Sequence, residues 1–170
     1  MSSTELRLSH IPTVKVGMLI RKPPGEVFQA VVDPDITTRF WFTRSSGKLT
    51  PGATVRWDWE MYDASATVRV KEVEDDRRLV FDWGEGDEST TVEFRFTPWE
   101  DDATYVEVTE SGLRGDGDEV LARAAGSTGG FTIALCALKA LLEHGVALTA
   151  VGDRYPKASD LLEGQVDGQR

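Results

Sequence analysis

Residues 53–62, ATVRWDWEMY, alternate apolar and charged side chains. The apolar members share one face of the run and are Val55, Trp57, Trp59 and Met61. The charged members share the opposite face and are Arg56, Asp58 and Glu60. A period of two is typical of a β-strand with one buried and one solvated face. The segment therefore predicts a strand that turns two tryptophans toward the core.

The same alternation recurs on both sides of this strand. It covers residues 13–21 before it and residues 66–70, 79–83, 92–96 and 105–108 after it. Short polar turns join the later runs, among them residues 74–77 (EDDR) and 100–102 (EDD). Tight turns join antiparallel neighbours, so the pattern predicts an antiparallel sheet of about six or seven strands.

Helical periodicity replaces the alternation in two places. Residues 24–33 and 35–42, after the first strand, predict two short helices. Further on, Ser127 or Thr128 can cap a long helix that reaches His144 and is closed by Gly145. Apolar side chains cover most of its circumference, so this helix must be buried.

A curved sheet with the long helix across its concave side buries all of these apolar faces. We therefore expect an α+β fold with two short helices after the first strand. A length of 170 residues suits one domain, which we assign to residues 1–150. Residues 151–170 are polar with little periodicity and predict a loosely ordered C-terminal tail.

The composition excludes several functional classes. The chain has 29 acidic and 19 basic residues, a formal net charge of -10. Nucleic-acid binding calls for a clustered basic face, and the sequence shows none, so we expect no nucleic-acid partner. The first twenty residues hold no continuous apolar run, so we expect a cytoplasmic protein without membrane insertion.

The sequence offers little reactive chemistry. Its two histidines are His10 and His144 and its one cysteine is Cys136, so a three-histidine or Cys/His zinc site cannot form. We expect no metal and no other cofactor, and we nominate no catalytic residue. For an enzyme, an inward carboxylate such as Glu60 or Glu107 would be the candidate acid or base.

The inward faces of the predicted elements are unusually aromatic. Bulky rings opposite a helix rich in Leu and Ala can leave a gap, although a solid aromatic core satisfies the same pattern. A gap would form a cavity between the long helix and the sheet, entered near residues 84–89 and 112–126. The candidate ligand-binding residues are Trp41, Trp57, Trp59, Met61, Phe81, Trp83, Phe94, Phe96, Leu135, Leu138 and Leu142.

Several stretches resemble a known family. They are residues 24–30 (PGEVFQA) with Asp33-Pro34, residues 40–42 (FWF), 78–83 (RLVFDW) and 108–113 (VTESGL), and Gly130-Phe131 in the last helix. Together they are similar to the AHSA1-like (Activator of Hsp90 ATPase homologue 1-like) branch of the START/Bet v 1 (SRPBCC) superfamily. The resemblance covers about residues 13–148, and Phe131 stands where the family more usually has Trp.

The resemblance implies a helix-grip fold and leaves three functions open. Small stand-alone members look like binders of hydrophobic small molecules, which is our first hypothesis. The family name implies an Hsp90-type co-chaperone or another protein partner, reached through the charged outer face formed by Arg56, Asp58, Glu60, Arg69 and Lys71. A cyclase- or aromatase-like enzyme is the third. The chain is expected to be a monomer or a homodimer.

Overall fold

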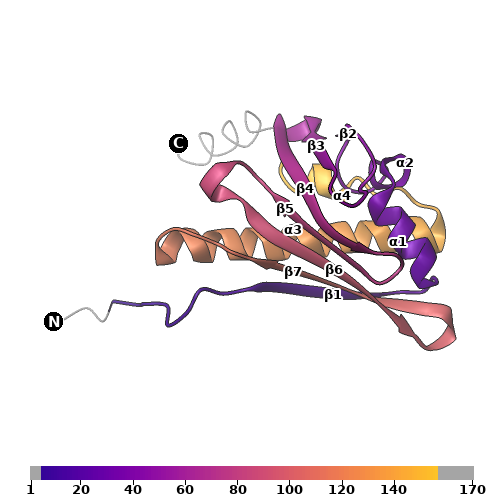
Figure 1. Cartoon of the computed structure of the whole chain (residues 1–170), viewed down its shortest axis with the longest axis horizontal. Coiled ribbons are helices and arrows are strands. Elements are labelled where there is room, and N and C mark those ends of the chain that lie inside the picture. Colours follow the sequence, from indigo (N-terminus) through magenta and orange to yellow (C-terminus); the bar gives the residue numbers. More distant parts are fainter. Residues whose placement is uncertain (1–4, 157–170) are drawn as a thin grey trace, which may run out of the picture.

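The computed structural model describes residues 5–156, which contain one antiparallel sheet and four α-helices. The sheet order is β1-β7-β6-β5-β4-β3-β2 (Figure 1). The strands are β1 (Val14–Ile20), β2 (Arg44–Ser45), β3 (Thr54–Trp59), β4 (Ala64–Glu74), β5 (Arg78–Trp83), β6 (Thr90–Trp99) and β7 (Ala103–Ser111). The helices are α1 (Pro24–Val32), α2 (Pro34–Thr37), α3 (Gly117–His144) and α4 (Ala150–Asp153). The predicted fold class is confirmed.

The core lies between one face of the sheet and α3, which runs behind the sheet in Figure 1. Alternate residues of β5, β6 and β7 point into it, including Phe81, Phe94 and Val106, all of which are buried. α1 covers another part of the same face and contacts β6 and β7. α3 is long and apolar enough to span a membrane by length and composition alone, but seven of its residues are buried in this core.

The long helix begins at Gly117, earlier than the predicted start at Ser127 or Thr128. Asp116 caps it: the Asp116 side chain accepts from the Glu119 amide at 2.9 Å, and the Glu119 side chain accepts from the Asp116 amide at 3.1 Å. This reciprocal arrangement is a capping box. Residues 117–126, predicted to be part of an entrance loop, are therefore helical.

Two other boundaries differ from the predicted ones. β3 ends at Trp59, and a 3₁₀ turn (Glu60–Tyr62) follows, after which Asp63 takes a left-handed conformation with φ of 48°. Met61 consequently leaves the inner face and is 40% exposed. α2 stops at Thr37 instead of reaching residue 42, and the chain continues in turns in which the amides of Phe40 and Trp41 donate to the Thr37 carbonyl.

The polypeptide after α3 returns toward the sheet. α4 contacts α3, and Val151 accepts a hydrogen bond from the hydroxyl of Tyr62 in the 3₁₀ turn after β3. The remainder of the predicted tail, residues 157–170, lies outside the described residues.

Candidate ligand-binding site

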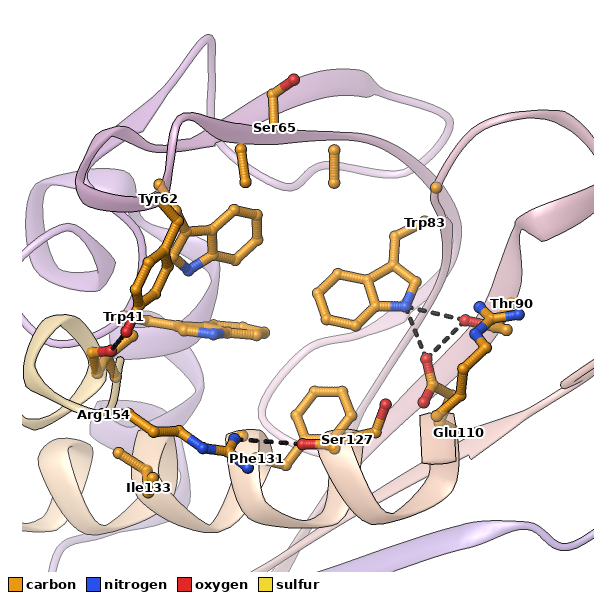
Figure 2. A pocket seen from close by; sticks show the side chains of 18 of the residues that line it. Trp41, Tyr62, Ser65, Trp83, Thr90, Glu110, Ser127, Phe131, Ile133 and Arg154 are labelled. Atoms are coloured by element: carbon orange, nitrogen blue, oxygen red, sulfur yellow. Dashed lines mark hydrogen bonds between the residues drawn. The ribbon is translucent and has the colours of Figure 1, made fainter. Parts of the chain in front are cut away.

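A cavity of about 560 Å³ lies between α3 and the sheet (Figure 2). Three tryptophans line it: Trp41 from the segment after α2, Trp59 from β3 and Trp83 from β5. The aromatic side chains that line the cavity pack against one another. Trp83 stacks on Phe131 of α3, with ring centroids 5.5 Å apart and planes at 24°. The centroid of the Trp41 ring lies 6.1 Å from the ring centroids of Trp83 and of Phe131. Such a fixed apolar wall suits a flat or bulky apolar molecule.

Small residues on the facing elements leave the space open. Gly126 and Gly130 of α3 line the cavity, as do Ala64 and Ala66 of β4. A Cβ atom added at Gly126 would meet no atom within 4 Å. The volume therefore exists because these positions carry almost no side chain.

One wall carries a buried polar cluster made by three neighbouring strands. Trp83 Nε1 donates to the Thr90 hydroxyl and to Glu110 Oε2, both at 2.9 Å, and Thr90 Oγ1 donates to the same Glu110 oxygen at 2.6 Å (Figure 2). Glu110 is only 2% exposed. Its other oxygen, Oε1, has no hydrogen-bond partner among residues 5–156.

The residues after α3 supply a second polar region of the lining. Arg154 donates through Nη1 to the carbonyl of Gly126 at 3.3 Å, and its guanidinium lies 4.9 Å from the centre of the Tyr155 ring. A Cβ at Gly129 would approach Arg154 Nη2 to 2.5 Å. The glycine at this position of α3 therefore makes room for the arginine.

The structure places the predicted ligand-binding residues in several different environments. Three of them line the cavity: Trp41, Trp59 and Trp83. Six are buried in the core beside it: Trp57, Phe81, Phe94, Phe96, Leu135 and Leu138. Leu142 is partly buried against that core, and Met61 is exposed outside it. A solid aromatic core and a cavity thus coexist at different places on the same face, and a role in ligand binding stays a prediction.

Sequence reasoning missed the carboxylate that faces the cavity. Glu60 is exposed and pairs with Arg44 at 3.2 Å, and Glu107 pairs with Lys15 at 3.6 Å on the outer face. Neither is therefore the inward carboxylate that the enzyme hypothesis would need. The inward carboxylate is Glu110. It continues the alternation of Val106 and Val108 by one further step, and that signal was present in the sequence.

The segment after α3 contributes to the site, and the sequence did not predict this. Arg154 and Tyr155 belong to the segment that was predicted to be a loose tail, yet both line the cavity.

Cys136 is exposed, and no group of three potential metal-ligating side chains occurs within the described part of the chain.

An open antiparallel sheet that wraps a long helix, with a cavity between them, defines the helix-grip (START/Bet v 1-like) class. The chain belongs to one family within it, because the family model "Activator of Hsp90 ATPase homolog 1-like protein" matches residues 21–143. The resemblance stated from the sequence is confirmed. No curated protein matches the chain.

Solved structures agree with this assignment. SSP2350 from Staphylococcus saprophyticus is 30% identical, with a TM-score of 0.68 over 81% of this chain and 96% of that one. DynU16, a protein in the dynemicin biosynthetic locus, is 29% identical with a TM-score of 0.68; the match covers 79% of this chain and 48% of DynU16. The Aha1 dimer from Colwellia psychrerythraea shares the fold at 19% identity and a TM-score of 0.69, over 79% of this chain and 98% of that one.

Proposed function

We propose that this protein binds an apolar small molecule in the cavity between α3 and the sheet. The observation that carries the proposal is the glycine content of α3 where this helix borders the cavity. Gly126 and Gly130 lie in the interior of α3 and line the cavity. Glycine in a helix interior is about 1 kcal/mol less favourable than alanine.

Filling the space would make the protein more stable. An alanine or leucine at Gly126 would raise the helix propensity of α3 and place apolar side-chain atoms in the cavity that Trp41 and Trp83 also line. A chain that only needed a solid core would gain from either substitution. Ligand binding gives a reason for keeping the space open, and the rigid tryptophan walls fit an apolar ligand.

The Gly126→Leu variant tests this proposal. The leucine should occupy the cavity while α3 stays intact, so the unfolding midpoint should equal or exceed that of the wild type. Ala125→Leu is the matched control, because Ala125 is the preceding residue of the helix and is exposed outside the cavity lining. Native mass spectrometry of protein purified from its own host would then show a bound small molecule in the wild type and in A125L, and a bare mass in G126L.

A second readout uses a known probe. 1-Methylnaphthalene should shift the indole N–H signals of the cavity tryptophans in ¹H–¹⁵N spectra of the wild type and A125L, and leave those of G126L in place. Two results together would reject the proposal: a bare wild-type mass, and indole signals that no naphthalene probe moves.

A protein-partner role is the second candidate, and family membership favours it. The family model is described by activation of the Hsp90 ATPase. The outer face of the sheet offers charged groups, but several pair with one another, including Arg56 with Asp58 at 2.9 Å and Lys71 with Asp82 at 3.5 Å. An Hsp90 ATPase assay with micromolar protein separates the two candidates, since a pure ligand-binding protein would give no stimulation.

A further inference from the structure

We propose that the cavity ligand carries a hydrogen-bond donor, a hydroxyl or an ammonium group, which it presents to Oε1 of Glu110. The inference rests on the proposed ligand-binding function and specifies the chemistry of the ligand. It predicts an apolar, preferably aromatic body with a donor at one end.

The two oxygens of Glu110 stand in different environments. Oε2 accepts hydrogen bonds from Trp83 Nε1 at 2.9 Å and from the Thr90 hydroxyl at 2.6 Å. Oε1 is buried and accepts none from residues 5–156. Nearly all buried polar atoms in folded proteins have a partner, because leaving one without a partner is unfavourable. An oxygen in this state requires a donor.

The position of Glu110 indicates where the donor comes from. Its side chain lines the cavity, and Figure 2 shows it across the open space from Trp41 and Tyr62. A molecule packed on the tryptophans can therefore extend one end toward the carboxyl group.

The chemistry of the carboxylate selects the donor class. A carboxylate oxygen accepts hydrogen bonds and carries negative charge, so it favours hydroxyl and ammonium groups over ethers, carbonyls and anions. Trp83 and Thr90 fix the carboxyl group through Oε2, so Oε1 is the oxygen left without a donor among residues 5–156.

Three naphthalene probes test the inference in the unaltered protein. They are 1-methylnaphthalene, 1-naphthalenemethanol and 1-naphthylmethylamine, which share one body and differ in the donor. Titrations followed by indole N–H signals should give tighter binding of a donor probe than of 1-methylnaphthalene, on the order of ten- to a hundredfold. The Trp83 indole signal should respond to the donor, because its N–H shares the carboxyl group. Comparison of the affinities of 1-naphthalenemethanol and 1-naphthylmethylamine distinguishes a preference for a neutral donor from a preference for a cationic one.

The probe results also separate this inference from the proposed function. Equal affinity for all three probes would overturn the donor requirement and leave cavity binding standing. If none of the three binds, cavity binding is overturned and the donor requirement falls with it.

Glu110→Gln supplies an independent test, because it should remove the preference for a probe that only donates. Trp83 and Thr90 hold an oxygen at the Oε2 position, so the glutamine amide nitrogen would occupy the Oε1 position and donate instead of accepting. In E110Q, 1-naphthylmethylamine, whose ammonium group only donates, should lose its advantage over 1-methylnaphthalene. Glu107→Gln, on the outer face of the same strand, should keep the wild-type order. An unchanged order in folded E110Q would contradict the inference.

Discussion

At the scale of single residues, Glu143 joins the end of α3 to the end of β1. Its Oε2 accepts from Lys139 Nζ at 2.6 Å and from the Arg21 amide at 3.1 Å, and the same lysine donates to the Leu19 carbonyl at 2.7 Å. Burial by itself would raise the pKa of Glu143. The hydrogen bonds from Lys139 and Arg21 outweigh that effect and hold the pKa below its ordinary value of 4.5.

This lowered pKa makes a prediction about acid stability. Because the unfolded carboxyl group binds a proton more readily than the folded one, its contribution is present above about pH 4.5 and is lost as the pH falls below that value. Glu143→Gln should cost about 1 kcal/mol at pH 7, and its unfolding free energy should fall less steeply than that of the wild type between pH 5 and pH 3. Urea unfolding at several pH values measures both. Parallel curves for the two proteins would contradict the assignment.

The residues of the candidate site were predictable to different degrees. Trp59 and Trp83 follow from strand alternation, and Glu110 follows from the same rule, although it was overlooked. Met61 was not predictable from alternation, because the strand ends at Trp59 and nothing in a period of two marks where a strand stops. Arg154 was not predictable either, since its place depends on how the chain returns after α3.

At the scale of elements, α3 shows why helix boundaries are difficult to predict. Ser127 and Thr128 are good cap residues and Gly126 before them disfavours a helix, so the sequence favours a start at Ser127 or Thr128. Packing overrides that local preference, because Val120 is buried in the core ahead of the glycines. The Asp-x-x-Glu pattern at residues 116–119 was the signal for the true start.

The capping box gives a prediction for this element. Asp116→Ala removes the acceptor for the Glu119 amide and should destabilise the protein by about 1 kcal/mol. Hydrogen exchange should quicken at the amides of the first turn of α3 and stay unchanged near Leu138. Asp116→Asn should keep nearly full stability, because asparagine caps helices as well as aspartate does. Equal exchange in wild type and D116A would show that the cap does not hold the helix end.

At the scale of the whole molecule, one continuous core joins the sheet to the helices. It includes residues of α1, α3 and strands β1 and β3–β7. The neighbouring strands β3 to β7 follow one another in sequence, so their order could be predicted from short turns. The pairing of β1 with β7 could not, because it joins segments far apart in the chain, with Val16 opposite Val108.

A shared core predicts a single unfolding transition. Four of the five tryptophans, Trp41, Trp57, Trp59 and Trp83, lie in or against the core, whereas Trp99 is 54% exposed. Tryptophan fluorescence therefore reports the packing of the sheet, while far-ultraviolet circular dichroism is dominated by α3. In urea, the two signals should change at the same midpoint. A helix signal lost at lower urea would show that α3 unfolds separately.

The open space in front of Gly126 also bears on how such proteins diversify. The glycine codons GGU and GGC are one nucleotide away from codons of alanine, valine and serine, and each of these side chains would enter the open space in front of Gly126 without opposing the helix. Stability and ligand size would then change in opposite directions along one short mutational path. Proteins that descend from one ancestor can therefore change from binding a large ligand to binding a smaller one, or none, through substitutions that keep the fold stable at every step.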